Sequence, residues 1–340
     1  MRIALIGPFD PKIDEGMRRL SVDLRGVLCQ SDDVLAMSPQ EFRSLRGIGM
    51  LRAFRPDCLH YISGPTLFSL LALRFHQVFS LGAVPTFATG LRPWLGPLSR
   101  RLLRLYAPTV FLSQSKIWHD LFETSGSKVI EFANWIDCKR FRVASDSERR
   151  RLRTQFSLPD DKPIVLHVGH LTKHRNLGCL LSIQRSGRFQ VLVVASESLS
   201  DDDDCKAQLE SEGCLVRRTY FPNIEDVYAA CDYYVFSARP LPAGRFPRFR
   251  GEIGVIDFPL SILEAMACGL PVVTTPHQTV KHFIGDVSGL AYFDGSADDC
   301  LLKLDAVSQQ AHNVRAIAER FDLKKCVERL KQLYAEHAMS

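Results

Sequence analysis

Ile164-Val-Leu-His-Val-Gly169 is a short apolar run that ends in glycine and is followed by polar residues. A run of this length, bounded by turn residues, predicts a buried β-strand. Arg2-Ile-Ala-Leu-Ile-Gly7 repeats the pattern near the start of the chain. Similar runs, separated by segments of helical periodicity, predict further strands at 57–62, 84–89, 109–112, 128–132, 190–195, 232–236 and 271–275. This alternation predicts an α/β fold built on parallel sheets.

The pattern starts twice, which predicts two domains. A charged segment at 145–153 and the turn Leu158-Pro-Asp-Asp-Lys-Pro163 precede the second start. A chain of 340 residues is long enough for two cores. We therefore expect a Rossmann-like N-terminal domain over 1–155 and a Rossmann-like C-terminal domain over 156–310. A terminal helical segment, 311–340, is expected to pack back toward the N-terminal domain.

Composition excludes several classes of protein. Apolar residues make up 46% of the chain and charged residues 24%, so a disordered, collagen-like or disulfide-scaffold protein is excluded. No apolar run approaches 18 residues, and the first apolar run is too short for a signal peptide. The ten cysteines are scattered without a CxxC pair, which predicts single thiols in a reducing compartment and no metal site. We expect a cytoplasmic chain.

Charge is divided unevenly along the chain. Residues 1–150 hold 21 Lys and Arg against 14 Asp and Glu, whereas the remaining residues hold 22 against 24. A basic first half predicts an anionic partner. Arg100, Arg101 and Arg104 lie among apolar residues, which suits peripheral contact with an anionic membrane at its inner face, a lipid-diphosphate acceptor site, or a core-facing helix with a solvated basic side. Exposed stacking aromatics do not recur, so nucleic-acid binding is not expected.

Polar residues that follow predicted strands are the first candidates for a site, because ligands of open parallel sheets bind beyond the carboxyl ends of the strands. Neither GxGxxG nor GxxxxGK[ST] is present, which removes the main support for a dinucleotide or P-loop site. Gly169 would let a ligand approach the backbone, and Arg175 is expected near a helix N-terminus, where it could clamp a phosphate. The alternative is a surface arginine on a solvated turn.

Glu264 is the second candidate. It lies among apolar residues in a predicted helix, 260–268, that Gly269 ends. A carboxylate in such surroundings needs polar partners, and sugar hydroxyls would be suitable ones. The alternative is a helix glutamate that faces solvent.

Four stretches in order resemble the family 4 retaining glycosyltransferases, the glycosyl transferases group 1. Leu263-Glu-Ala-Met-Ala-Cys-Gly-Leu-Pro-Val-Val273 is similar to the donor-site signature of that family. Ala133-Asn-Trp-Ile-Asp137 with Phe141 resembles the end of its first domain, and Val168-Gly-His-Leu-Thr-Lys-His-Arg175 resembles its phosphate loop. Glu225-Asp-Val-Tyr-Ala-Ala-Cys-Asp232 resembles its approach to the donor loop. The resemblance implies a GT-B fold, with two Rossmann-like domains facing a central cleft.

The resemblance also implies roles for individual residues. Glu264 would bind the ribose hydroxyls of a nucleotide-sugar, and Arg175 would neutralise its diphosphate. His170 stands where the family has arginine, beside Gly169 of the phosphate loop. Backbone amides over 256–258, those of Ile256 and Phe258 included, would hold phosphate or the donor sugar.

Two departures from the family pattern leave catalytic positions open. The family shows Glu-x7-Glu, but Ile256 stands where the first Glu is expected. Asp257 is the nearest carboxylate, and Glu252 is an alternative. The family's histidine in the first domain is also missing from its expected place. His60, at the end of another strand, is a substitute, although a lone histidine at a strand end is commonly structural.

The function implied is retaining transfer of a hexosyl group from a UDP- or GDP-sugar to a glycan, glycolipid or small-molecule acceptor, without a metal or other cofactor. The alternatives are a catalytically weakened, glycosyltransferase-like binding subunit and a sugar-nucleotide epimerase.

Overall fold

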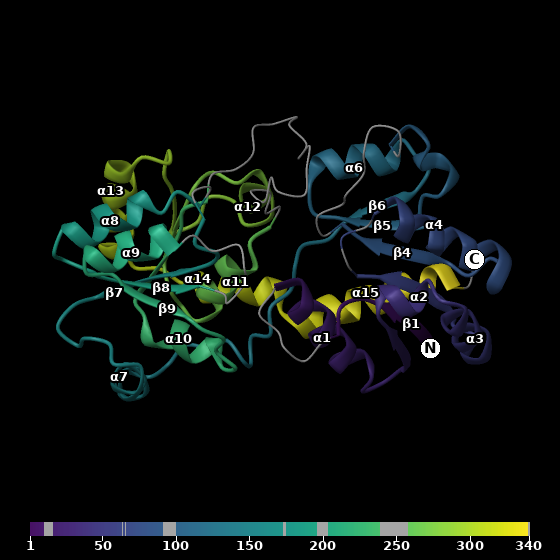
Figure 1. The fold of residues 1–340 in the computed structure, drawn as a ribbon, viewed down its shortest axis with the longest axis horizontal. Coiled ribbons are helices and arrows are strands. Elements are labelled where there is room, and N and C mark those ends of the chain that lie inside the picture. Colours follow the sequence, from purple (N-terminus) through teal and green to yellow (C-terminus); the bar gives the residue numbers. More distant parts are fainter. Residues whose placement is uncertain are drawn as a thin grey trace. The chain divides into compact units, whose positions relative to one another are not determined.

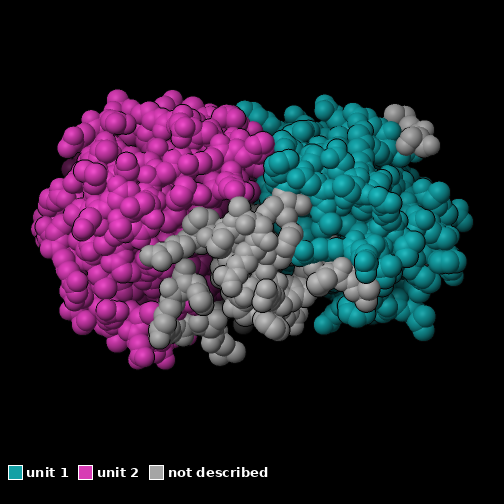
Figure 2. Space-filling view, turned by 90° about the horizontal axis from the view of Figure 1, so that it is seen from above, with its two compact units in different colours: residues 1–135, 323–340 teal, residues 136–322 magenta. Residues whose placement is uncertain are grey.

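Two six-stranded parallel sheets organise the protein, as the alternating pattern predicts (Figure 1). The computed structural model describes residues 1–9, 16–62, 64, 66–90, 100–172, 175–195, 203–238 and 258–338. The chain forms two compact units, coloured separately in Figure 2. Unit 1 comprises Met1–Trp135 and Leu323–Ser340, and unit 2 comprises Ile136–Asp322.

The sheet of unit 1 has the strand order β2-β1-β3-β4-β5-β6. Its strands are β1 (Arg2–Ile6), β2 (Asp33–Met37), β3 (Cys58–Tyr61), β4 (Thr86–Thr89), β5 (Val110–Ser113) and β6 (Lys128–Glu131). Its helical segments are α1 (Gly16–Leu28), α2 (Pro39–Phe42), α3 (Leu45–Phe54), α4 (Leu67–Phe75), the π-helical η1 (His76–Ser80), the 3₁₀ turn η2 (Leu103–Leu105), α6 (Lys116–Glu123) and α15 (Leu323–Ala338).

The sheet of unit 2 has the order β12-β11-β10-β7-β8-β9. Its strands are β7 (Ile164–Val168), β8 (Gln190–Ala195), β9 (Leu215–Arg218), β10 (Tyr233–Phe236), β11 (Val272–Thr274) and β12 (Leu290–Tyr292). Its helical segments are α7 (Asp146–Gln155), α8 (Gly178–Arg185), α9 (Asp203–Ser211), α10 (Ile224–Ala230), α11 (Leu260–Ala267), α12 (Gln278–Phe283), α13 (Ala297–Ser308), α14 (Val314–Ala318) and the 3₁₀ turn η4 (Glu319–Phe321).

In each sheet, later strands are added first on one side of the first strand and then on its other side. In unit 1, β2 lies on one side of β1 and β3 on the other. In unit 2, β8 lies on one side of β7 and β10 on the other. The carboxyl ends of β1 and β3, and of β7 and β10, are therefore the topological switch points at which open parallel sheets bind ligands.

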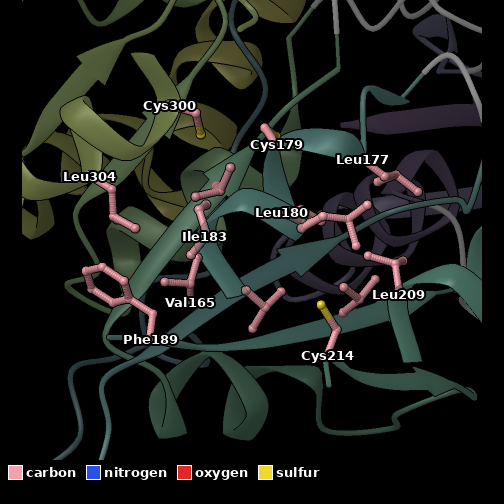
Figure 3. Packing of buried hydrophobic residues seen from close by; sticks show 14 of the residues in the cluster. Val165, Leu177, Cys179, Leu180, Ile183, Phe189, Leu209, Cys214, Cys300 and Leu304 are labelled. Atoms are coloured by element: carbon pink, nitrogen blue, oxygen red, sulfur yellow. The ribbon is translucent and has the colours of Figure 1, made fainter. Parts of the chain in front are cut away.

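A buried apolar cluster fixes the sheet of unit 2 against α8 and α13 (Figure 3). Val165 of β7 packs with Leu180 and Ile183 of α8, and with Leu304 of α13. Figure 1 shows α8, α9 and α13 on one face of this sheet, with α7 and α10 on the other. Both faces are covered, which explains why β7 is a continuous apolar run.

The division between the units differs from the expected boundary at residue 155, because α7 belongs to unit 2. Arg149 and Arg153 in α7 both pair with Asp232, at 2.8 and 2.5 Å. The backbone NH of Ile136 donates to the carbonyl of Phe321. These contacts join 136–155 to unit 2.

The terminal segment is also divided. It is not one helix from 311 onward: α14 and η4 belong to unit 2, and the chain enters unit 1 at Leu323. In α15, Lys331 pairs with Asp32 at 2.8 Å. This pair joins α15 to the segment before β2.

Candidate functional site

Glu264 is held inside unit 2 by a hydroxyl partner. Its side chain lies in α11, which begins after Pro259 and ends where Gly269 takes a φ of 81°. Only 5% of Glu264 is exposed, so the residue does not face solvent. The Tyr228 hydroxyl of α10 donates to its carboxylate at 2.7 Å. This charge-assisted hydrogen bond orients the carboxylate.

Arg175 is also buried, with 6% of its surface exposed. It lies three residues before α8, which begins at Gly178. Its backbone NH donates to the carbonyl of Thr172, and its carbonyl accepts from the Ser237 hydroxyl at 2.7 Å. The guanidinium lies 5.9 Å from the centre of the Phe236 ring. The end of β10 thus fixes an arginine that follows β7.

The hydroxyl of Tyr234 in β10 is influenced by the charges of both Glu264 and Arg175. This hydroxyl donates to the carbonyl of Val168 at 3.4 Å, at the carboxyl end of β7. Burial raises the pKa of this phenol; the Glu264 charge raises it further, whereas the Arg175 charge lowers it. Both charges therefore lie close enough to act on one hydroxyl at the β7–β10 switch point.

Gly169 and His170 follow β7 directly. The NH of Gly169 donates to the carbonyl of Val194. A Cβ placed on Gly169 would lie 3.8 Å from Nη1 of Arg175, so this glycine keeps the backbone open beside the guanidinium. His170 is half-buried, and its carbonyl accepts from the NH of Thr172.

His167 is a residue that our sequence reasoning did not single out. It is fully buried in β7, and its Nδ1 donates to the carbonyl of Val235 at 2.9 Å. That bond places the proton on Nδ1 and leaves Nε2 as an acceptor, which finds no partner among the residues that the structure describes. A Cβ on Gly169 would lie 3.4 Å from this Nε2. The only available signal was position, in the strand that leads into the phosphate-loop glycine.

Two histidines near Arg175 are kept neutral. Burial is the main cause that lowers the pKa of His167 to about 4; the hydrogen bond to Val235 opposes it, and the Arg175 charge contributes to the lowering. Burial likewise lowers the pKa of His277 to about 4, again with a contribution from Arg175. Nε2 of His277 donates to the carbonyl of Ala238 at 3.1 Å. At neutral pH, Arg175 therefore supplies positive charge here without help from these imidazoles.

The loop after β10 is described only at its two ends, over 237–238 and from Phe258 onward. Ile256, Asp257 and the alternative Glu252 lie outside the described residues. Phe258 is buried, with its ring 5.5 Å from that of Phe283 and 5.9 Å from that of Phe321. The role expected for the backbone amide of Phe258 stays a prediction.

His60 occupies a different kind of position, in unit 1. It is fully buried in β3, and both ring nitrogens have hydroxyl partners: Tyr334 at Nδ1 and Thr89 at Nε2, the latter at 2.7 Å. Burial lowers its pKa to about 3. With no nitrogen left to contact a substrate, this geometry favours the structural interpretation of His60 over the catalytic one.

The three arginines of the basic segment differ in their surroundings. The Arg100 guanidinium lies 5.9 Å from the centre of the Trp118 ring. Arg101 and Arg104 are exposed, and Nε of Arg104 donates to the carbonyl of Thr124. Leu103 and Tyr106 of the same segment are buried, so one side of it packs against unit 1.

Neither a metal site nor a membrane span appears in the described part of the chain. No group of three or more His, Cys, Asp or Glu side chains there could hold a metal ion. No helix among those residues is both long and apolar enough to cross a bilayer. All ten cysteines are free thiols.

Comparison with known proteins bears directly on this site. The family model described as glycosyl transferases group 1 matches residues 162–317. The chain is 27% identical over 276 residues to a GDP-mannose-dependent alpha-mannosyltransferase of Mycobacterium tuberculosis, and 24% identical over 293 residues to the sulfoquinovosyl transferase SQD2 of Arabidopsis thaliana. These matches cover 72% and 79% of this chain, but only 64% and 52% of the two relatives.

Solved structures resemble the chain over nearly its whole length. HepE of Anabaena, in complex with UDP and glucose, superposes with a TM-score of 0.71 at 17% identity, covering 99% of this chain and 100% of that one. A glycosyltransferase of Rickettsia africae gives 0.72 at 14% identity, covering 99% and 98%. These superpositions show that the chain has the GT-B fold. At identities this low they show the fold alone. Residues 162–317, just under half of the chain, are similar to the glycosyl transferases group 1.

Proposed function

We propose that this protein transfers a hexosyl group from a UDP- or GDP-sugar to a glycan, glycolipid or small-molecule acceptor, with retention of anomeric configuration and without a metal ion. The observation that carries the proposal is that Arg175 and Glu264 are both buried in unit 2 and that the charge of each acts on the pKa of Tyr234, whose hydroxyl bonds to Val168 at the β7–β10 switch point. The similarity to a GDP-mannose-dependent mannosyltransferase, and to HepE bound to UDP and glucose, supports a nucleotide-sugar donor.

Glu264 would bind the ribose. Its carboxylate already accepts one hydrogen bond from Tyr228, and two ionised oxygens together can accept more. Adjacent ribose hydroxyls are donors that a carboxylate can engage together. A buried carboxylate without enough hydrogen-bond donors around it is costly. A ligand that brings hydroxyl donors to Glu264, as ribose does, is therefore favoured.

Arg175 would bind the diphosphate. A guanidinium presents several donors to phosphate oxygens, and burial strengthens that interaction relative to water. Gly169 allows the phosphates to approach the backbone after β7, and His170 stands beside them. Backbone amides over 256–258, those of Ile256 and Phe258 included, are proposed to hold phosphate or the donor sugar.

The reaction breaks the bond between the anomeric carbon and the diphosphate oxygen. Negative charge then develops on the departing diphosphate, where Arg175 would stabilise it in the transition state. The acceptor hydroxyl attacks the same face of the sugar, and its proton passes to the departing phosphate oxygen. Such a route needs no paired acid and base carboxylates of the hydrolase kind. Asp257, or Glu252, stays a candidate for orienting the donor sugar.

A direct test is donor binding followed by turnover. The full-length protein is incubated with UDP-sugars and GDP-sugars, and binding is measured by thermal shift and by calorimetry, because a ligand that binds the folded state raises its apparent stability. Release of UDP or GDP, by transfer or slow hydrolysis, supports the proposal. Tight binding without release would instead identify the weakened binding subunit. No binding to any nucleotide-sugar would refute the proposal.

Metal independence has its own test. EDTA should leave the rate of UDP or GDP release unchanged, because Arg175 supplies the positive charge that a metal would otherwise bring. Loss of release on adding EDTA, restored by Mg²⁺, would contradict this.

We also retain peripheral contact with an anionic membrane through Arg100, Arg101 and Arg104 as a proposal, with the cytoplasm as the proposed compartment. Exposure of Arg101 and Arg104 supports it, whereas the buried Leu103 equally suits the packed-helix interpretation.

A further inference from the structure

An exposed apolar stripe runs along α4 and η1 in unit 1. Phe68 and Phe79 are 69% and 70% exposed, and Leu71, Phe75 and Val78 are each more than 40% exposed. These five residues, which we call the α4–η1 stripe, follow the spacing of one helix face. The rings of Phe75 and Phe79 lie 5.5 Å apart, so their apolar surfaces are contiguous.

The opposite face of the same helices is already used for packing. Leu70 and Leu73 are buried, and Nε2 of His76 bonds to the carbonyl of Phe42 at 2.9 Å. The α4–η1 stripe is therefore not the core face of α4. A contiguous apolar patch on the outside of a domain, aromatic in part, is typical of a surface that contacts a partner.

The stretch of sequence that contains the stripe is rich in basic residues. Between residues 42 and 119 the sequence has ten Lys and Arg but a single acidic residue, Asp57. Asp57 itself pairs with Arg2 at 3.3 Å. Arg74 of α4 is exposed and bonds to Gln77, a neutral side chain. Arg52 is also exposed, and it lies in α3, a helix that contacts η1.

We infer that the α4–η1 stripe, flanked by Arg52 and Arg74, is a docking surface for an anionic lipid bilayer. Aromatic and aliphatic side chains would enter the boundary between headgroups and acyl chains, and the two guanidiniums would contact lipid phosphates. The contact is peripheral, consistent with there being no helix in the described residues that could span a bilayer.

Charge favours a lipid surface over a second copy of this chain. A twofold dimer would bring each patch against itself, so Arg52 and Arg74 would face like charges across an apolar interface. An anionic bilayer pairs the same arginines with phosphates and buries the phenylalanines. The inference is independent of the proposed sugar transfer, because it uses neither Arg175 nor Glu264.

This surface is distinct from the segment that holds Arg100, Arg101 and Arg104. The two surfaces can be told apart by which substitutions weaken binding to vesicles. If α4–η1 carries the contact, charge reversal at Arg52 and Arg74 abolishes binding, and the same change at Arg101 and Arg104 has the smaller effect.

The test is co-sedimentation of the full-length protein with vesicles of phosphatidylcholine alone, or with about one third phosphatidylglycerol, in the absence of nucleotide-sugar. Wild type should bind the anionic vesicles and release them as salt is raised. Phe75→Ser/Phe79→Ser and Arg52→Glu/Arg74→Glu should each lower the partition coefficient at least about tenfold. Leu302→Ser, at a leucine of unit 2 that is 63% exposed, is the matched control and should bind as wild type does.

A reporter variant keeps the result interpretable if a double mutant folds poorly. Phe79→Trp places an indole on the stripe, and its emission should shift to the blue with anionic vesicles. Equal sedimentation of wild type and both double variants, or no blue shift, would overturn the inference. So would a dimer in analytical ultracentrifugation that Phe75→Ser/Phe79→Ser dissociates, since the stripe would then join two copies.

Discussion

The two units have the same kind of switch point but fill it differently. In unit 1, a Cβ on Gly7 would lie 2.5 Å from a methyl of Ile62, so side chains already occupy the space between β1 and β3. In unit 2, the nearest atom to a Cβ on Gly169 is Nε2 of His167, at 3.4 Å. The glycine after the first strand thus serves packing in unit 1 and leaves room beside Arg175 in unit 2.

The strand histidines repeat this contrast. His60 and His167 are both fully buried and both neutral. Hydroxyls satisfy both nitrogens of His60, whereas Nε2 of His167 has no partner among the described residues. An unsatisfied buried acceptor is costly unless a ligand completes it. In this protein, the candidate site therefore lies at the switch point where a buried polar atom has no hydrogen-bond partner among the described residues.

The largest expected effect is on turnover at the unit 2 switch point. Arg175→Ala should lower the rate of sugar transfer by about 10²–10³, the scale of losing one transition-state donor. Steady-state kinetics measure it. Arg188→Ala, which breaks an exposed pair with Asp305, is the control and should keep the wild-type rate. An unchanged rate in Arg175→Ala would show that Arg175 does not act in the reaction, and the assignment of the site to unit 2 would lose its main support.

The two glycines should respond oppositely to an added methyl group. Gly7→Ala must displace Ile62 and should destabilise the protein by about 1–3 kcal/mol in urea unfolding. Gly169→Ala should leave the free energy of unfolding within about 0.5 kcal/mol of wild type, since its Cβ would make ordinary contacts. Its effect should appear in donor affinity instead. Equal destabilisation by both would mean that the two switch points are equally filled.

The pH dependence of stability should reveal the neutral histidine of unit 1. The pKa of His60 is about 3 in the folded protein against an ordinary value of 6.5. The unfolded chain therefore binds the extra proton first, so this contribution is fully present above pH 6.5 and is lost as pH falls toward 3. Between about pH 7 and 5.5 the loss from His60 is on the order of 1 kcal/mol.

His60→Asn removes that titration and should make unfolding less sensitive to pH in the same interval. Chemical denaturation at several pH values checks it. An unaltered pH profile in the variant would show that His60 is not buried in its neutral form.

The smallest expected effect distinguishes the two histidines in ligand binding. In His167→Asn, the new side-chain amide can still donate to the carbonyl of Val235, but the Nε2 acceptor is gone. If the nucleotide-sugar donates a hydrogen bond to Nε2 of His167, the Kd of the nucleotide-sugar should rise about fivefold in this variant. A rise of that size corresponds to the loss of about one hydrogen bond between neutral groups. His60→Asn is the matched control and should leave Kd unchanged. Calorimetry that finds the same Kd in both variants would exclude a ligand contact at His167.

Most of the sheet strands could be predicted from the sequence, and the misses share a cause. β1, β7, β8 and β10 are continuous apolar runs because both faces of a parallel sheet are covered. We missed β2, β9 and β12, which lie at the edges of the two sheets. Arg217 and Arg218 in β9 illustrate why: an edge strand is partly exposed and need not be apolar throughout.

The candidate site could be predicted in part. Glu264 and Arg175 stood out from their neighbours in sequence, and both are buried in unit 2. His167 could not be found, because a histidine in an apolar strand looks the same whether or not its second nitrogen has a partner. The role of α7 was also hidden, since only the fold brings Arg153 to Asp232.

By itself, the sequence determined the alternation of strands and helices, the number of sheets and the residue types available at strand ends, because these follow from local periodicity and turn chemistry. Only the tertiary structure decided which strands became neighbours, which polar atoms stayed incomplete and which apolar residues of α4 remained outside. Those outcomes depend on contacts between residues far apart in the chain, and such contacts leave no signature in a local pattern.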